Sequence, residues 1–341
     1  MPVHNFDRPQ GRLEHMTIDS SAVANNVLGD PTSRNVAIYL PPGYDESKEE
    51  YPLFVDIVGF TAGGYAHVAW KAFGESVPQR IDRLIAEGKM GPVVLALPDC
   101  FTSLGGNQYV NSAAVGNWAD FLTAEMIPAI EGRYRVRKGR QSRALFGKSS
   151  GGYGAIAHAM LHSDHWSAIA CHSGDMAFEW CYLPDLPKTL MHLARHDGNI
   201  KAFIDHMRED RKVGGGDLHH LMMLAMAATY DPDPEAPYGI QLPVDMETCE
   251  LITERWDKWL EWDPVQLVER EDVQSNLKSM GGIYIDCGGR DQYNLVFGAR
   301  RLTRRLADLE IDHHYEEFDD NHSSVDYRMD VSLPWLYERL K

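Results

Sequence analysis

The sequence lacks long apolar runs and paired cysteines, and each absence excludes a class of protein. No apolar stretch approaches the roughly 20 residues that a membrane-spanning helix needs. The five cysteines are odd in number and widely spaced, without a C-x-x-C pair, which argues against a disulfide framework or a zinc knuckle. Residues 1–15 show no basic leader followed by an apolar segment. We therefore expect a soluble protein of a reducing compartment, the cytoplasm.

Positive charge is also scarce. The 33 Lys and Arg are outnumbered by 50 Asp and Glu, which gives a net charge of −17. Such a field repels polyanions and argues against nucleic acid or an anionic membrane surface as a partner. The acidity is concentrated in residues 231–272, where 13 Asp or Glu accompany 3 Lys or Arg. A solvated outer face explains this segment, and a field that disfavours anionic substrates at a site entrance is the alternative.

Repeats of solenoid length and low-complexity tracts are absent too, and what remains is an alternation of strand-like and helix-like segments. Short apolar runs, typical of strands buried on both faces of a parallel sheet, occupy residues 52–59, 92–99, 142–147, 167–174 and 281–288. Amphipathic spacing predicts helices over residues 76–87, 118–131, 153–161 and 295–309. Residues 12–18 and 35–40 precede this alternation and predict antiparallel lead-in strands, and residues 314–318 predict a short last strand. The order predicts an α/β fold with one mostly parallel central sheet flanked by helices.

Residues 175–271 interrupt the alternation, because they contain helical patterns and no convincing buried strand. Helices are expected over residues 199–208, 218–229 and 250–262, and Asp263 followed by Pro264 is typical of a helix start. We therefore expect a single domain over residues 1–341 with an inserted helical cap over residues 175–271.

One motif carries a specific chemistry. Residues 147–151, Gly-Lys-Ser-Ser-Gly, match G-x-S-x-G between a strand-like run and a helix-like run. A nucleophile on a sharp strand-to-helix turn needs small neighbours two residues away on either side, where a Cβ would collide with adjacent strands. Ser149 has glycine at both positions and Ser150 does not, so Ser149 is the expected nucleophile and the Ser150 N–H an oxyanion donor. The alternative is a glycine-rich turn that only packs helix on strand.

A serine hydroxyl needs a base, and the base needs an orienting acid; in this type of fold they follow in the order Ser, Asp or Glu, His. Asp291 follows the strand at residues 281–288, and His322 follows the last strand, so both are expected at the sheet edge that presents Ser149. Asp175, after an earlier strand, is the alternative acid. The rival histidines are less well placed: His172 lies within a strand, and His313 and His314 lie at a strand entrance.

The loops after two further strands supply other candidates. The N–H of Phe60, after Gly59, is the expected second oxyanion donor, and an ordinary strand-to-helix loop is the alternative. Gln108 and Tyr109 are candidate substrate contacts, although a structural loop accounts equally well for residues 105–112. The histidine pairs of the chain lack a convincing ligand set, so neither a metal nor another cofactor is expected.

The chain resembles the putative-esterase family of α/β-hydrolases, which includes esterase D (S-formylglutathione hydrolase), enterochelin-esterase-like proteins and mycolyltransferases. The marks of this resemblance are residues 34–44, Gly59 with Phe60, residues 105–112, residues 147–155, and His322 with Arg328. Two departures are Val58, where this fold often has histidine, and a longer cap than esterase D would suggest.

The resemblance implies an α/β-hydrolase fold with Ser149, Asp291 and His322 as the triad and the Phe60 and Ser150 N–H groups as the oxyanion hole. We therefore expect a serine carboxylesterase that acts on a small-molecule ester through an acyl-enzyme. The alternatives are an acyltransferase of the mycolyltransferase type, an S-formylglutathione hydrolase, and a catalytically silent binding protein. Self-association into a homo-oligomer stays open.

Overall fold

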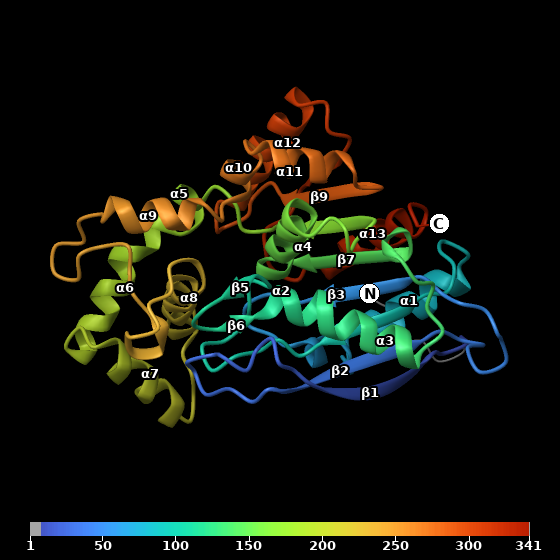
Figure 1. Cartoon of the computed structure of the whole chain (residues 1–341), viewed down its shortest axis with the longest axis horizontal. Helices are drawn as coiled ribbons and strands as arrows, with labels where there is room; N and C mark the ends of the chain where they lie inside the picture. The colour runs from blue at the N-terminus through green and yellow to red at the C-terminus, as the bar shows by residue number, and fades with distance from the viewer. Residues whose placement is uncertain (1–7, 341) are drawn as a thin grey trace.

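The structure, a computed structural model, describes residues 8–340 and is built around one eight-stranded sheet (Figure 1). The strand order is β1-β2-β4-β3-β7-β8-β9-β10. β1 and β2 are antiparallel, β2 and β4 are antiparallel, and all later neighbours are parallel. The strands are β1 (Arg12–Asp19), β2 (Ser33–Leu40), β3 (Leu53–Ile57), β4 (Val94–Pro98), β7 (Arg143–Lys148), β8 (Ala168–His172), β9 (Gly282–Gly288) and β10 (His314–Phe318). The predicted α/β fold with a mostly parallel sheet is confirmed.

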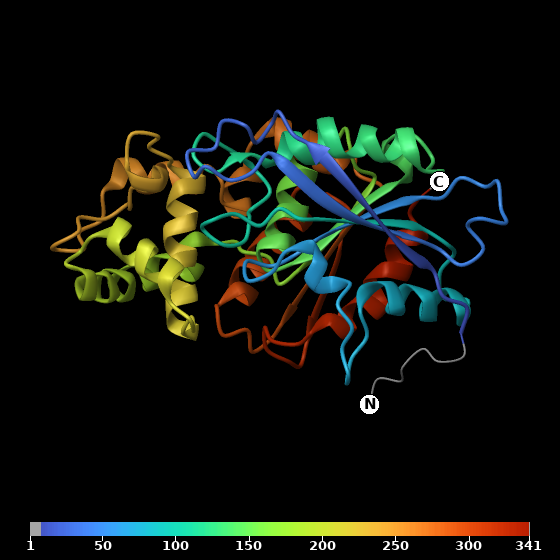
Figure 2. The same ribbon diagram turned by 90° about the horizontal axis from the view of Figure 1, so that it is seen from below.

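Helices cover both faces of the sheet, and each layer closes its own hydrophobic core (Figure 2). One face carries α2 (Trp118–Asp120), η2 (Phe121–Met126), α3 (Ile127–Arg133), α4 (Ser150–Leu161) and α12 (Leu295–Asp308). The other face carries α1 (Val77–Ala86) and α13 (Met329–Tyr337). Because β3, β8 and β9 are buried along their whole length and β7 is buried up to Gly147, their apolar residues serve both cores, as the unbroken apolar runs indicated.

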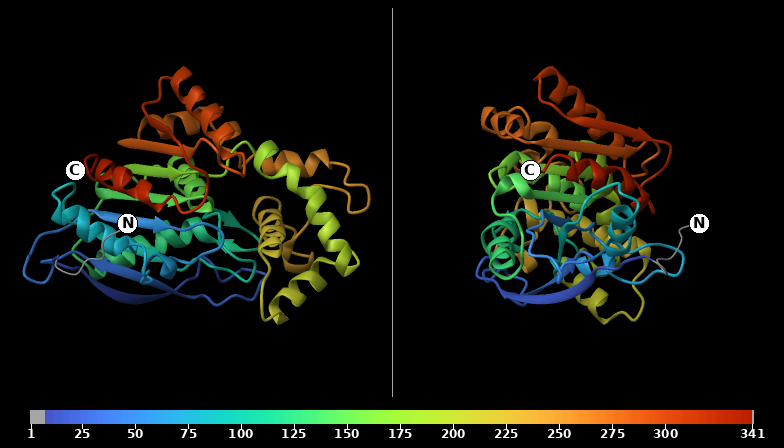
Figure 3. Two further views of the ribbon diagram at one scale, coloured as in Figure 1. Left: turned by 180° about the vertical axis from the view of Figure 1, so that it is seen from behind. Right: turned by 90° about the vertical axis from the view of Figure 1, so that its right-hand side faces the viewer.

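The residues between β8 and β9, all of which the structure describes, form no named strand and contribute one isolated bridge, Val244 to Leu251. Helices α6 to α9 lie beyond one end of the sheet in all views (Figures 1 and 3). The helices are α5 (Phe178–Cys181), α6 (Leu186–Leu193), α7 (Ile200–Glu209), α8 (Gly215–Tyr230), α9 (Thr253–Leu260), α10 (Pro264–Leu267) and α11 (Glu271–Lys278). Helices α10 and α11 instead pack on α4.

Asp263 begins α10 as its pattern predicted, and it also holds a second helix. One carboxylate oxygen accepts hydrogen bonds from the backbone N–H groups of Val265 and Ala177, and the other accepts one from that of Phe178. The N-termini of α5 and α10 therefore share one buried carboxylate, which satisfies donors that have no partner within either helix.

The helix expected over residues 118–131 is interrupted. Its middle, η2, is a π-helix, and Pro128 stands near the start of the α-helical turn that follows. Proline has no N–H to give to the helical ladder, which favours a change of hydrogen-bond spacing at this point. The preceding loop contains a small ribbon, β5 (Asn111–Ser112) with β6 (Gly116–Asn117), that was not predicted. Within residues 8–340, no helix is long and apolar enough to cross a membrane.

Candidate active site

Ser149 stands alone on a sharp turn between β7 and α4. Its φ of +59° and ψ of −123° are a strained combination for a residue with a side chain. A Cβ on Gly147 would lie 2.2 Å from the carbonyl oxygen of Ile57, and a Cβ on Gly151 would lie 2.0 Å from the same oxygen. Both glycines are therefore required by the close approach of β3, and the turn presents the Ser149 side chain to a cavity.

His322 and Asp291 meet at the carboxyl ends of β10 and β9. Nδ1 of His322 lies 2.8 Å from Oδ2 of Asp291, and both residues are buried. The backbone N–H of Tyr293 donates to the other oxygen of Asp291 over 2.9 Å, and the Tyr293 ring packs edge-on against the imidazole. The His322 backbone N–H is bound by the side-chain oxygen of Gln292. These contacts fix the imidazole and leave Nε2 as the nitrogen available to a substrate or a nucleophile.

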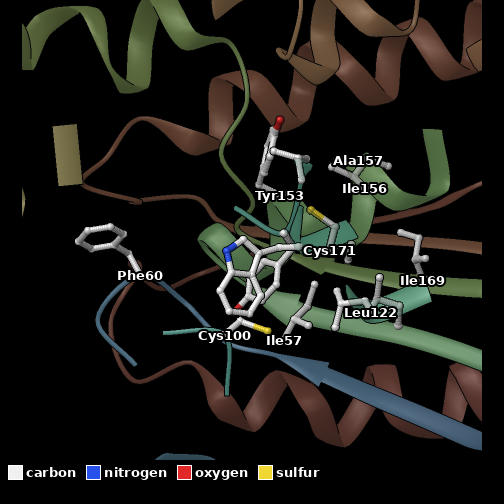
Figure 4. Packing of buried hydrophobic residues seen from close by; sticks show 14 of the residues in the cluster. Ile57, Phe60, Cys100, Leu122, Tyr153, Ile156, Ala157, Ile169 and Cys171 are labelled. Atoms are coloured by element: carbon white, nitrogen blue, oxygen red, sulfur yellow. The ribbon is translucent and has the colours of Figure 1, made fainter. Parts of the chain in front are cut away.

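The two backbone N–H groups expected to bind an oxyanion both lack an acceptor. Within residues 8–340, neither the Phe60 nor the Ser150 N–H donates a hydrogen bond to the protein. The Ser150 N–H belongs to the first residue of α4, where such donors are free. A Cβ on Gly59 would lie 3.4 Å from Cβ of Ser149, so the loop that carries Phe60 passes beside the serine. Figure 4 shows the Phe60 ring to one side of the cluster around Ile57.

Ser149, His322 and Phe60 line one cavity of about 440 Å³. Residues near the sheet edge give it a polar, charged side, and residues of α5, α8 and the start of α12 give it a largely apolar side. The other lining residues are Gly59, Thr61, Ala62, His67, Lys148, Asp175, Cys181, Tyr182, Gly215, Leu218, His219, Met222, Tyr293, Leu295, Ser323, Ser324 and Asp326. None of residues 231–272 is among them, so the acidic segment does not form the cavity wall. A second groove, of about 520 Å³ on the outer face of α12, contains none of the predicted site residues.

Gln108 and Tyr109 lie behind the cavity and are not among its lining residues. Both are buried, with exposed fractions of 1% and 2%. The Tyr109 hydroxyl donates to the carbonyl oxygen of Val58 over 2.6 Å, and Nε2 of Gln108 donates to Oγ of Ser150 over 2.8 Å. The two side chains therefore support the loops around Ser149, and in this structure they lack the exposure that a direct contact with substrate requires.

The structure reveals a second histidine with a carboxylate partner in the same cavity. Nδ1 of His67 lies 2.6 Å from Oδ2 of Asp56, which is fully buried on β3. Burial lowers the pKa of His67, but the Asp56 carboxylate outweighs burial and the pKa is raised overall. No sequence pattern predicts this pair, because Asp56 occurs within an apolar strand pattern and His67 follows a glycine-rich loop.

The rival residues weighed from the sequence fall elsewhere or take other roles. His172 is bound to Asp286 over 2.7 Å and to Ser332 over 2.9 Å, and it does not line the cavity. His314 stacks on Tyr284. Asp175 does line the cavity, but its side chain is hydrogen-bonded to Tyr182 and Gln108 and not to His322. In residues 8–340, no group of three or more His, Cys, Asp or Glu side chains is arranged to hold a metal ion.

The strand order, the sharp turn at Ser149 between β7 and α4, and the position of the loop that carries His322 define the α/β-hydrolase fold. The family model described as putative esterase matches residues 31–332, and the chain belongs to this family. Esterase Rv1288 of Mycobacterium tuberculosis (strain ATCC 25618 / H37Rv) is 35% identical over 169 residues, which cover 48% of this chain and 32% of that protein. The matched part is thus about a third of the length of that curated relative.

Solved structures agree on the fold. A ferulic acid esterase superposes with a TM-score of 0.61 at 18% identity, over 97% of this chain and 99% of that chain. An S-formylglutathione hydrolase from Agrobacterium tumefaciens superposes with a TM-score of 0.60 at 16% identity, over 99% of both chains. A ferulic acid esterase from Anaeromyces mucronatus superposes with a TM-score of 0.56 at 14% identity, over 99% of this chain and 92% of that chain.

Proposed function

We propose that the chain is a serine carboxylesterase with Ser149 as nucleophile, His322 as general base and Asp291 as the orienting acid. The observation that carries the proposal is that Ser149, on its strained turn, shares one cavity with an imidazole tethered to a buried carboxylate. Membership in the putative esterase family supports the choice of an ester as substrate.

The mechanism follows from these positions. Nε2 of His322 takes the proton of the Ser149 hydroxyl while Oγ of Ser149 attacks the carbonyl carbon of the ester. The negative charge that develops on the carbonyl oxygen is bound by the N–H groups of Phe60 and Ser150, which have no other acceptor among residues 8–340. His322 then gives the proton to the leaving alcohol, an acyl-enzyme remains on Ser149, and water hydrolyses it by the same steps. Asp291 holds the imidazole in the required tautomer and stabilises its protonated form.

We also propose that residues 175–271 act as a cap that shapes the substrate site. This segment supplies Cys181 and Tyr182 at one part of the cavity and Leu218, His219 and Met222 at another. Apart from Asp175 and His219, this segment lines the cavity with uncharged residues, which favours an uncharged portion of the substrate there.

Hydrolysis of p-nitrophenyl acetate by the purified chain tests the proposed function. Ser149→Ala is expected to lose at least about 10³-fold in kcat with an unchanged circular dichroism spectrum. A folded variant that retains near wild-type turnover would contradict the proposal. A panel that contains S-formylglutathione and a feruloyl ester, chosen from the activities of the similar structures, then sorts the substrate class. Product analysis with an added alcohol separates hydrolysis from acyl transfer.

A further inference from the structure

Asp175 places a carboxyl group in the wall of the proposed ester site without a cation to balance it. The residue follows β8, is 5% exposed and lines the same cavity as Ser149 and His322. Across residues 8–340, no Lys, Arg or His forms an ion pair with it. A buried carboxyl without a cation is costly unless hydrogen bonds satisfy it, so each of its oxygens needs a donor.

Among the described residues, only one of the two Asp175 oxygens has hydrogen-bond donors. Oδ2 accepts from the Tyr182 hydroxyl over 2.9 Å and from Nε2 of Gln108 over 3.4 Å. Oδ1 has no hydrogen-bond donor within residues 8–340. It is also not one of the polar side-chain atoms that are fully enclosed by protein without a partner, so part of its surface stays accessible. Oδ1 is therefore the acceptor that Asp175 offers to the contents of the cavity.

The carboxyl group is held rigidly and in apolar surroundings. The Tyr182 ring packs edge-on against Phe178 at 4.7 Å and against Trp259 at 5.9 Å between ring centroids. Cys181, Leu218 and Met222 line the same cavity. Burial raises the pKa of Asp175 to about 6, while the Tyr182 hydroxyl and the nearby His322 oppose the rise. A hydrogen bond to a fixed acceptor in such a site discriminates strongly between ligands that can donate and ligands that cannot.

We propose that Asp175 is a specificity-determining residue that accepts a hydrogen bond from a hydroxyl group of the substrate near the scissile ester. The inference rests on the proposed function, because it assigns part of the substrate of that site. A hydroxyl suits Asp175 in either protonation state, since Oδ1 can accept from it in both. A carboxylate on the substrate would instead be repelled by the ionised form. Asp175 lines the same cavity as Ser149 and His322, which places the hydroxyl near the reacting bond.

Two pairs of esters of matched shape test the proposal. Methyl 3-hydroxybutyrate against methyl 3-methylbutanoate places the hydroxyl or a methyl group in the acyl part. 2-Hydroxyethyl acetate against propyl acetate places it in the alcohol part. Each kcat/KM is divided by the rate constant of hydroxide-catalysed hydrolysis of the same ester, which removes the intrinsic effect of the hydroxyl. The ratio within a pair is the hydroxyl preference, measured for wild type, Asp175→Asn and Asp326→Asn.

Asp326 provides a matched control, because it is another carboxylate of the same cavity but is already paired with Lys71 at 3.3 Å. We expect the wild type to prefer the hydroxylated ester of one pair by at least about tenfold, the effect of one hydrogen bond to a charged group. In Asp175→Asn the donors Tyr182 and Gln108 retain the amide oxygen in the place of Oδ2, so an NH2 group, which cannot accept a hydrogen bond, replaces Oδ1. The ratio is then expected to fall to within threefold of 1. Asp326→Asn is expected to keep it. The pair that responds identifies the part of the substrate that carries the hydroxyl.

Several results would overturn the inference. A wild type without a hydroxyl preference in either pair does so without any variant. A hydroxyl preference that Asp175→Asn retains would also overturn it. The same holds if Asp326→Asn loses the preference to the same extent as Asp175→Asn. If Asp175→Asn does not fold, Tyr182→Phe is measured in its place. This variant removes the hydroxyl donor that holds Oδ2, so the carboxyl group is no longer fixed and the hydroxyl preference should fall at least threefold. An unchanged ratio in Tyr182→Phe contradicts the proposal. Hydrolysis that depends on Ser149 but shows no preference refutes only the role of Asp175, whereas a folded wild type that hydrolyses no ester refutes the proposed function and this inference with it.

Discussion

Nδ1 of His322 lies 2.8 Å from Oδ2 of Asp291, although 30 residues separate them in the chain and each belongs to the loop after a different strand. The neighbouring strands β9 and β10 are parallel, so their carboxyl ends bring the two loops together. The Asp291 carboxylate accepts a hydrogen bond from Nδ1 of His322, so Nδ1 carries the proton of the neutral imidazole. Nε2 is then unprotonated and able to act as a base.

Replacement of Asp291 by asparagine should remove this control of the tautomer. An amide group can donate to Nδ1 and so favours the form that carries its proton on Nε2. We expect Asp291→Asn to lower kcat for p-nitrophenyl acetate by about 10²- to 10⁴-fold with little change in thermal stability. Asp319→Asn is the control, since Asp319 is 90% exposed and paired with Arg290, and it should stay within twofold of wild type. A loss below threefold in Asp291→Asn would contradict the assigned role.

The two histidines of the cavity can be told apart by their variants. His322 follows the last strand, the position that this fold gives to the base, whereas His67 is bound to Asp56. We expect His322→Ala to lose at least about 10³-fold in kcat and His67→Gln to retain more than a tenth. The reverse order, measured with p-nitrophenyl acetate on folded protein, would show that the pair His67–Asp56 supplies the base.

The glycines of the nucleophile turn are expected to be structural requirements. A Cβ on Gly151 would lie 2.0 Å from the carbonyl oxygen of Ile57, and a backbone atom of a central strand cannot move aside. Gly151→Ala should therefore cost at least about 2 kcal/mol in the free energy of unfolding or prevent folding. Gly132→Ala is the control, because a Cβ there meets nothing within 4 Å on α3; it should stabilise by about 0.5–1 kcal/mol. Equal stabilities in urea unfolding would contradict this view of the turn.

His158 should make the fold sensitive to acid. It is fully buried; Nδ1 accepts from Trp166, and Nε2 donates to the carbonyl oxygen of Tyr109. Burial lowers its pKa to about 3, against about 6.5 in the unfolded chain. Between these two pKa values the unfolded state binds a proton that the folded state does not. For this residue the free energy of unfolding therefore decreases by about 1.4 kcal/mol for each unit by which the pH is lowered.

The measurement is urea unfolding of wild type, His158→Gln and His206→Gln from pH 7 to pH 4. As the pH falls, the free energy of unfolding should decrease less steeply in His158→Gln than in wild type. The difference in slope should correspond to nearly one proton, about 1.4 kcal/mol per pH unit. His206 is exposed on α7, and its replacement should leave the slope as it is. Parallel curves for wild type and His158→Gln would disprove the contribution of His158.

The elements that depend on local sequence patterns could be predicted from the sequence. The parallel strands appear as unbroken apolar runs because both of their faces are buried, and the position of Ser149 follows from the two glycines that β3 requires. Sheet topology then explains why Asp291 and His322 could be expected at one edge.

The remaining features depend on packing between distant segments. Gln108 and Tyr109 looked available for substrate, but their loop folds under Val58 and Ser150 and buries both. Asp56 and His67 form a pair only because a short helical turn returns over β3. The environment of Asp175 requires α5 to bring Tyr182 back over the end of β8, and no spacing rule predicts such a return.

Reaction with a fluorophosphonate, followed by peptide mapping by mass spectrometry, tests the central claim most directly. The reagent phosphonylates a serine that a neighbouring base has activated. We expect one adduct per chain on the peptide that contains Ser149, slower labelling in His322→Ala and none at this position in Ser149→Ala. A folded wild type that acquires no adduct, or an adduct on another residue that persists in Ser149→Ala, would contradict the role of Ser149 as nucleophile.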